Sequence, residues 1–324
     1  MPNPHLNQLW SLPRYGSPDD LLLVQRPLPN PLKNQIRVRV HNLSINAGDL
    51  HLVGGNPWLA RPIFGGFRRP KFSPGMDVAG VVDAIGDQVT RFKLGDPVAA
   101  DLSGSRFSGF ATTVCASEQV WAPIPRGVSF EDAAATPVAA VTALQALRDH
   151  GQLRPGERVW IRGASSGVGS FAVQIAALLA GSVTASCRPE KRPALAELKM
   201  VTWLDGDEPA EPFDLIIDHA AYTPLTKTAK RARKGGRYVL VGGSNFRFFQ
   251  VLLLKKFLSI WTGRSIRTLA AQPSPTDLEQ LFAWIGAGSL KPIIGRRYRF
   301  DQIPQALTAM KNREIAGKAV ISLD

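Results

Sequence analysis

The sequence predicts an α/β protein of two domains, a partly open β-barrel followed by a doubly wound parallel sheet. Its 324 residues are 44% hydrophobic, which is enough to bury a large core. The first 125 residues are rich in Gly and Pro and contain short alternating runs such as QIRVRV and DPVAADL, a pattern that favours a barrel. Farther along the chain, apolar strand-like runs alternate with helix-like runs, which indicates parallel βαβ units.

The pattern changes at Ser129, which is followed three positions later by Asp132. This is a capping-box pattern that predicts the start of a helix, and Pro137 predicts a break in it. The runs RVWIR, SVTASC, FDLIIDHA and GRYVLVGG then predict parallel strands, with a helix to about Ala180 after the first of them. The tail again mixes strand and helix, and we expect it to return to the first domain. The predicted domains are residues 1–125, completed by about 291–324, and residues 126–290.

Composition limits the classes of partner and compartment. Cys115 and Cys187 are too few for a disulfide framework or a thiolate metal site and fit a reducing compartment, so we expect a cytoplasmic protein. No run of about 18 uncharged apolar residues occurs, and the first ten residues lack a secretory pattern. The formal net charge of +13 is compatible with nucleic acid, acidic lipid headgroups or an anionic cofactor.

Two basic stretches receive different interpretations. In KTAKRARKGGR (227–237) the cations are typical of the last turn of a helix that ends at Gly235 and Gly236. The stretch FRFFQVLLLKKFLSIW (246–261) fits a buried helix or a substrate lid, and it also fits a peripheral membrane contact through Lys255 and Lys256. Nucleic acid is disfavoured as a partner, because aromatic residues are not interleaved with the basic clusters.

A glycine turn in WIRGASSGVGSFAV is the main binding motif. Ala164, Ser166 and Gly169 occupy the three places of a G-x-G-x-x-G fingerprint, so two of its three glycines are replaced. Gly167 still permits close approach of a backbone, and Gly169 still permits close packing of the helix. A predicted strand precedes the turn and a predicted helix follows it, which is the context in which such turns bind dinucleotides.

The tip of the second strand indicates which dinucleotide binds. NAD sites carry an acidic residue about 20 positions after the fingerprint, whereas this strand ends in SVTASCRPEKR. Ser186, Arg188 and Lys191 would donate to a 2′-phosphate, which favours NADPH. The alternative is a solvated loop from which Glu190 reaches the ribose of NADH.

In the order of its parts the chain resembles the medium-chain dehydrogenase/reductase superfamily. The resemblance extends over nearly the whole chain, through SINAGDLHLVGG, PGMDVAGVVDAIGDQVTRFKLGDPVAA, AAATPVAAVTALQAL, GASSGVGSFAVQIA, GGRYVLVGG and GKAVISL. It implies a GroES-like catalytic domain followed by a Rossmann nucleotide-binding domain. We therefore predict that the cofactor contacts are Ala164, Ser166, Gly167, Val168, Gly169, Ser186, Arg188, Lys191, Val241, Gly242 and Gly243.

Within the superfamily the chain is similar to the zinc-free quinone oxidoreductases. Where zinc alcohol dehydrogenases have a Cys ligand this sequence has Asn46, and their Gly-His-Glu segment corresponds to Gly75, Met76 and Asp77. The four-cysteine structural lobe has no counterpart, so we predict no metal site. Without a Lewis acid, we expect hydride transfer from NADPH to a quinone or an α,β-unsaturated carbonyl compound.

The resemblance also implies catalytic residues. Asn46 and Thr142 match residues that lie beside the nicotinamide, and His51 stands where many quinone reductases have a Tyr. His51 would donate to the acceptor carbonyl; the alternatives are a proton from water and a structural His. Asp49 and Asp77 are each interpreted as bonding backbone in a turn.

Two further functions stay open at this point. The chain could be an NADPH-binding protein of the same fold with little turnover that associates with membranes, or one that binds RNA. For the enzyme, the expected partner is a small-molecule acceptor, and the expected state is a monomer or a homodimer.

Overall fold

The computed structural model describes residues 5–58, 61–62, 65–179, 182–198, 200–204, 211–220, 223–242, 255 and 257–323. The chain forms two compact units. Unit 1 contains the chain up to Val138, Pro273–Gly288 and the chain from Ile294, and unit 2 contains Ala139–Gln272 and Ser289–Ile293. The tail thus packs with the first part of the chain.

The boundaries of the units differ from the predicted division at residues 125 and 291. Helix α2 (Phe130–Ala135) packs against the strands of unit 1, and so does helix α7 (Pro275–Gly286). Ser129 caps α2 by accepting a hydrogen bond from the backbone N–H of Asp132 at 3.0 Å, and helix α3 (Pro137–Gln145) begins at the predicted break. Helices α2 and α7 are held in unit 1 by contacts with strands that are distant in the sequence. A local sequence pattern gives no information on such contacts.

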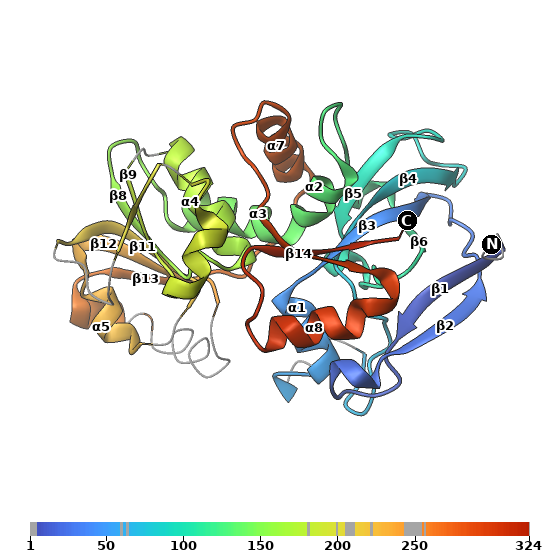
Figure 1. Ribbon diagram of the computed structural model, residues 1–324, viewed down its shortest axis with the longest axis horizontal. Helices are drawn as coiled ribbons and strands as arrows, with labels where there is room; N and C mark the ends of the chain where they lie inside the picture. Colours follow the sequence, from blue (N-terminus) through green and yellow to red (C-terminus); the bar gives the residue numbers. More distant parts are fainter. Residues whose placement is uncertain are drawn as a thin grey trace. The chain divides into compact units, whose positions relative to one another are not determined.

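Unit 1 is built on a seven-stranded sheet with a separate hairpin (Figure 1). Strands β14, β15, β3, β4, β5 and β7 lie side by side in that order, and β6 pairs with β3. The hairpin joins β1 to β2 in antiparallel fashion. The bounds are β1 Leu6–Ser11, β2 Leu22–Pro27, β3 Gln35–Ile45, β4 Asp77–Ile85, β5 Pro97–Asp101, β6 Thr113–Ser117, β7 Trp121–Pro123, β14 Ile294–Arg299 and β15 Lys318–Ser322.

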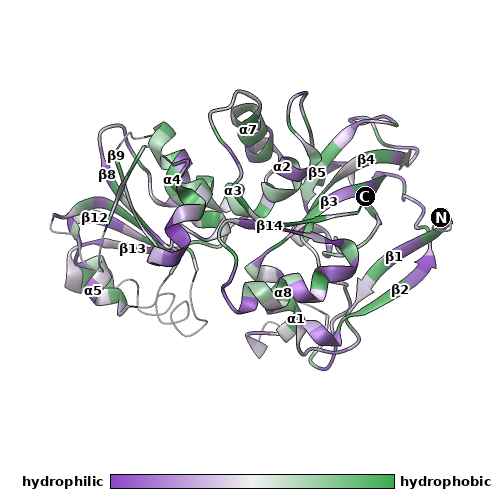
Figure 2. Ribbon diagram, viewed as in Figure 1, coloured by the Kyte–Doolittle hydropathy of each residue, from purple (hydrophilic) through white to green (hydrophobic). Residues whose placement is uncertain are grey.

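The returning tail completes the core of unit 1. Strand β15 is parallel to β14 and antiparallel to β3, with Ala319 opposite Ile45. Helix α8 (Ile303–Lys311) carries hydrophobic and hydrophilic residues on different faces (Figure 2), and its Ile303 and Leu307 are fully buried. Helix α1 (Ala47–Gly54) begins directly after β3. The end of β3, the start of β15 and the first turn of α1 therefore meet in the interior of this unit.

Unit 2 is a six-stranded parallel sheet in the order β10-β9-β8-β11-β12-β13 (Figure 1). In chain order this is 3-2-1-4-5-6, the doubly wound order of Rossmann folds, so the predicted nucleotide fold is confirmed. The strand order reverses between β8 and β11, and their carboxyl ends mark the usual place of a ligand. The bounds are β8 Arg158–Arg162, β9 Ser182–Ser186, β10 Val201–Trp203, β11 Phe213–Asp218, β12 Ala232–Leu240 and β13 Ser265–Thr268.

The helices of unit 2 precede or follow these strands in the sequence. Helix α3 continues into a π-helical turn at Ala146–His150, and α4 (Gly167–Leu179) packs on β8 and β9. Helix α5 (Leu225–Ala229) packs on β12.

Short 3-10 turns are found in both units. They occupy Pro18–Asp20, Leu102–Ser105, Glu118–Val120, Pro189–Leu195 and Phe300–Gln302. No helix in the described part of the chain is long and apolar enough to cross a membrane.

The prediction that a helix runs to Gly235 and Gly236 was wrong. Helix α5 ends at Ala229, and both glycines lie inside β12. The pairing of β12 with β11 shifts in register between Phe213 and Leu215, and Gly235 has a φ of 75°. The glycines thus allow an irregularity in a strand, where left-handed backbone is needed, and they do not end a helix.

Candidate active site

The glycine turn joins β8 to α4 in the expected geometry. Gly163 has a φ of 78°, and the Ser166 hydroxyl accepts a hydrogen bond from the backbone N–H of Gly169 at 2.9 Å. A Cβ atom on Gly169 would lie 2.2 Å from the carbonyl oxygen of Gly163, so only glycine lets the helix approach the turn this closely. Ala164 is buried, Ser166 is exposed, and Gly167 and Val168 are half-buried. The first N–H groups of α4 have no partner within the helix and favour a phosphate.

Backbone hydrogen bonds join the turn to the tip of β9. The carbonyl oxygen of Ser186 accepts from the N–H groups of Gly163 and Ala164 at 2.9 and 3.1 Å. The Ser186 hydroxyl accepts from the indole N–H of Trp160 at 3.1 Å. Residues that follow β9 are therefore held beside the residues that begin α4.

The loop after β9 is basic and accessible. Arg188 is exposed and lies 3.3 Å from the carboxylate of Glu190, which is also exposed, and Lys191 is half-buried. A surface pair of this kind is weak, so the guanidinium can exchange the Glu190 carboxylate for a phosphate. Ser186 thus ends β9, Arg188 follows it and Lys191 lies in the 3-10 turn Pro189–Leu195, so all three are near the tip of β9.

A buried ion pair fixes the ends of three strands in unit 2. Arg162, at the end of β8, donates to Asp218 Oδ2 at 2.6 Å, and the hydroxyl of Tyr238 on β12 donates to the same oxygen at 2.8 Å. Asp218 Oδ1 accepts from the N–H of Ala220 at 2.9 Å. The backbone on either side of His219 is therefore held in place.

His219 is a candidate that sequence reasoning missed. Among the described residues no partner lies within hydrogen-bond distance of its buried Nε2 atom, and burial lowers the pKa of His219 to about 4. A Cβ atom on Gly163 would lie 3.3 Å from the Cβ of His219, and one on Gly242 would lie 3.3 Å from its carbonyl oxygen. Val241 donates its N–H to the backbone carbonyl oxygen of Asp218 at 3.0 Å, while Gly243 lies outside the described residues. The only signal in the sequence was the position of His219 directly after a predicted strand.

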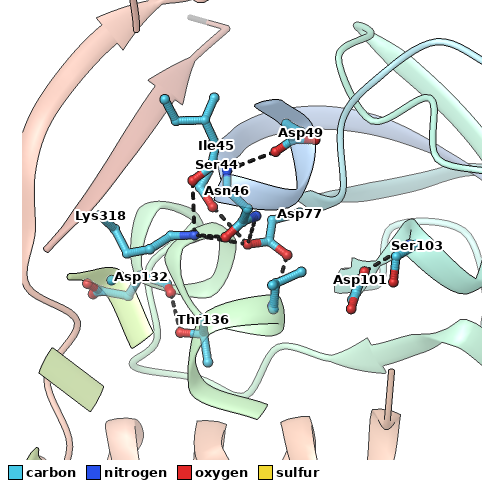
Figure 3. A network of polar contacts seen from close by, with 12 residues as sticks. Ser44, Ile45, Asn46, Asp49, Asp77, Asp101, Ser103, Asp132, Thr136 and Lys318 are labelled. Carbon is cyan, nitrogen blue, oxygen red and sulfur yellow. Dashed lines mark hydrogen bonds and ion pairs between the residues drawn. The ribbon is translucent and has the colours of Figure 1, made fainter. Parts of the chain in front are cut away.

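Unit 1 contains a buried polar cluster around Asp77 (Figure 3). Lys318 Nζ donates to Asn46 Oδ1 at 2.5 Å and to Asp77 Oδ2 at 3.2 Å. The amide N–H of Asn46 and the hydroxyl of Ser44 donate to the same Asp77 oxygen at 2.8 and 2.9 Å. Asp77 Oδ1 accepts from the N–H of Val138 at 3.0 Å. The side chain of Lys318 is 2% exposed and that of Asp77 is 0% exposed, so both charges are removed from water.

Two more acidic residues lie at the edge of this cluster. Asp49 accepts from the N–H groups of Asn46 and Gly75, as its turn interpretation predicts, and burial raises its pKa to about 8, with repulsion from Asp77 adding to the effect. Burial also raises the pKa of Asp101 to about 7, again with a contribution from Asp77. The turn interpretation of Asp77 itself was wrong, because Asp77 begins β4 and mainly binds side chains.

The positions that match zinc ligands carry side chains that are engaged in other contacts. In the part of the chain that the structure describes, no group of three His, Cys, Asp or Glu residues could hold a metal ion. Met76 packs against α1, since a Cβ on Gly48 would lie 2.4 Å from its methyl carbon. The oxygens of Asn46 and Asp77 already bind the ammonium group of Lys318, a cation that the protein itself supplies.

The predicted catalytic residues belong to two segments, the β3–α1 region of unit 1 and helix α3. Asn46 precedes α1 and His51 lies in its last turn, so both belong to unit 1. His51 lies at the surface of unit 1. Neighbouring atoms cover part of its ring, and this partial loss of solvent lowers the pKa of His51 below its usual value. Thr142 is half-buried on α3 in unit 2.

Comparison with known proteins identifies the class. Residues 32–126 match the family described as alcohol dehydrogenase GroES-like domain, and residues 197–321 match the family described as zinc-binding dehydrogenase. The two matches together cover more than half of the chain. The chain therefore belongs to the medium-chain dehydrogenase/reductase superfamily and is quinone oxidoreductase-like. The predicted GroES-like fold of the first domain is confirmed.

Individual relatives and solved structures agree with this family assignment. The chain is 27% identical to a quinone oxidoreductase of Sus scrofa, over 96% of both chains. It is 28% identical to a chloroplast envelope quinone oxidoreductase homolog of Arabidopsis thaliana, over 92% of both. The fold is similar to that of the quinone oxidoreductase from Coxiella burnetii, with a TM-score of 0.87 and 23% identity over 98% of this chain and 100% of that one. The family thus implies an oxidoreductase with a nicotinamide cofactor and a small-molecule substrate.

Proposed function

We propose that this protein is a zinc-independent reductase that uses NADPH to reduce a quinone or an α,β-unsaturated carbonyl compound. The observation that carries the proposal is the Lys318, Asn46 and Asp77 cluster, in which two residues that match the zinc-binding segments of alcohol dehydrogenases bind an ammonium group of the protein itself. An active site without a Lewis acid polarises an alcohol poorly. A quinone or an enone already has an electrophilic carbon and needs less polarisation. Relatives named as quinone oxidoreductases support the same class of acceptor.

The preference for NADPH follows from the tip of β9. The residues there are a hydroxyl and two cations, Ser186, Arg188 and Lys191, and no carboxylate stands on the strand itself. A 2′-phosphate binds such donors through charge-assisted hydrogen bonds. The N–H groups that begin α4 would hold the pyrophosphate, and we assign the unpartnered Nε2 of His219 to the cofactor as well.

The remaining roles belong to residues of unit 1 and to Thr142. When bound, NADPH supplies the hydride and its electrons. Asn46 has its amide oxygen and its amide N–H both engaged, so the side chain is held in one orientation. We propose that Asn46 and Thr142 orient the nicotinamide ring. Burial lowers the pKa of His51, which favours its neutral ring, and we propose that the ring N–H donates to the developing oxyanion while water supplies the proton.

We also propose that the protein works in the cytoplasm. Cys115 lies in unit 1 and Cys187 in unit 2, and both are free thiols. Two free thiols without a disulfide fit a reducing compartment.

The test is steady-state oxidation of NADPH and NADH with a panel of quinones and enals. Charge-assisted contacts to the 2′-phosphate predict a preference for NADPH of about ten- to a hundredfold. The change Arg188→Ala should remove about tenfold of this preference and leave the rate with NADH unchanged. Arg154→Ala, another exposed arginine of unit 2, serves as the matched control and should change neither rate. Equal use of both cofactors by the parent would contradict the cofactor assignment, and no turnover with any acceptor would contradict the proposed reaction.

A further inference from the structure

Nearly all the excess charge of this protein comes from one continuous stretch of sequence. Residues 219–276 contain eleven Lys and Arg residues and no Asp or Glu. The rest of the chain holds 28 basic and 26 acidic residues, so this stretch supplies +11 of the net charge of +13. The stretch lies in unit 2 apart from its last four residues, and it includes α5, β12 and β13.

Some of these cations are compensated within unit 2. Arg233 lies 2.6 Å from the Asp214 carboxylate, and Arg237 lies 2.5 Å from that of Glu157. Arg264 and Arg267 donate to backbone carbonyl groups. Lys227 on α5 and the two cations directly after this helix lie around an open hollow. This hollow is lined by Thr226, Lys227, Lys230 and Arg231.

An apolar ridge lies beside the hollow. It consists of Phe257, Ile260 and Trp261, whose exposed fractions are 66%, 84% and 58%. All three are in the helical residues 257–262, where their spacing places them on one face, while Leu258 and Thr262 on the other face are buried. Lys230 Nζ lies 4.8 Å from the ring centre of Trp261, so the ridge and the basic hollow are neighbours.

We propose that the ridge and the hollow together dock this protein on an anionic membrane surface. The hollow would take the phosphate of a lipid headgroup, and the ridge would enter the boundary between headgroups and acyl chains. Aromatic and aliphatic side chains next to lysines are the composition of interfacial segments, because the rings bury apolar area while the cations meet anionic lipid. This binding is independent of the proposed reductase activity.

Two other partners for this face, a second copy of the chain and single-stranded RNA, fit its charge and chemistry less well than an anionic membrane. A two-fold dimer through the same face would bring two clusters of Lys227, Lys230 and Arg231 into one interface, and the like charges would repel. Single-stranded RNA would use the aromatic rings as stacking platforms, but the most exposed residue of the ridge is the aliphatic Ile260, which cannot stack on a base.

The test is co-sedimentation of the full chain with phosphatidylcholine vesicles, with and without phosphatidylserine. We expect binding only to the vesicles that contain phosphatidylserine. Each cation near the surface contributes about fivefold to the affinity, so Lys227→Ala with Lys230→Ala should weaken binding roughly thirtyfold. Ile260→Ser with Trp261→Ser should reduce binding to background. Met200→Ser, which alters an equally exposed apolar residue elsewhere in unit 2, should bind like the parent.

Circular dichroism and melting temperature verify that each variant is folded, since all the altered residues are on the surface. The proposal is overturned if the parent binds both kinds of vesicle equally, or if the folded ridge variant binds like the parent. It is also overturned if the ridge variant turns a dimer into a monomer in light scattering, or if the parent binds single-stranded RNA through Trp261 and ignores the vesicles.

Discussion

Replacing Lys318 by Met should strongly destabilise unit 1. The lysine and Asp77 are both buried, and their groups lie 3.2 Å apart within a cluster of neutral donors and acceptors. Met fills a similar volume but leaves the carboxylate of Asp77 without its cation. Breaking a buried ion pair from one side costs about 3 to 5 kcal/mol of unfolding free energy. In a unit of this size that loss corresponds to a fall in melting temperature of about 6 to 20 °C.

The assay is urea unfolding followed by circular dichroism, with a double-mutant cycle. Asp77→Asn removes the charge that Lys318 compensates, so the double variant should be more stable than the sum of the two single losses predicts, by at least about 1 kcal/mol. Lys291→Met is the matched control, because Lys291 pairs with Glu197 at 2.7 Å in an exposed bridge that contributes about 0 to 1 kcal/mol. A Lys318→Met variant as stable as this control would refute the account of the cluster, and so would simple additivity in the cycle.

Three further predictions concern single side chains. Burial and Asp77 raise the pKa of Asp101 to about 7, so the folded chain holds a proton that the unfolded chain releases above about pH 4. This stabilisation is present below about pH 4 and is lost as the pH rises through 7, and Asp101→Asn should flatten the resulting fall in unfolding free energy between about pH 4 and 7 in urea titrations. His219→Leu should weaken NADPH binding by about two- to tenfold in calorimetry, and because the pKa of His219 is about 4, the loss should be the same at pH 6 and pH 8. His51→Phe should lower turnover by about ten- to a thousandfold in steady-state assays, whereas an unchanged rate would show that His51 does not assist the acceptor oxygen.

Local pattern was sufficient to predict the architecture of unit 2. Its central strands β8 and β11 are almost fully buried and contain short apolar runs, which is the signature of parallel strands covered on both faces. The glycine turn could be recognised for the same reason. A Cβ atom on Gly169 would lie 2.2 Å from the carbonyl oxygen of Gly163, so this place of the motif requires glycine. The helix start at Ser129 depends on one side chain and the N–H three residues later, which is also a local feature.

The polar cluster of unit 1 could not be predicted in this way. Lys318 and Asn46 are 272 residues apart, and they meet because β15 pairs with β3. A lysine at the start of a C-terminal strand looks like an ordinary surface residue until that pairing is known. The error over Gly235 has a similar origin, since the irregularity in β12 is a property of its pairing with β11.

The most direct test of the account measures NADPH oxidation by a quinone before and after the purified protein is treated with a metal chelator. We expect an unchanged rate, because the oxygens of Asn46 and Asp77 bind the ammonium group of Lys318 and the proposed reaction uses no metal. A rate that falls to background on chelation and returns when zinc is added would contradict it.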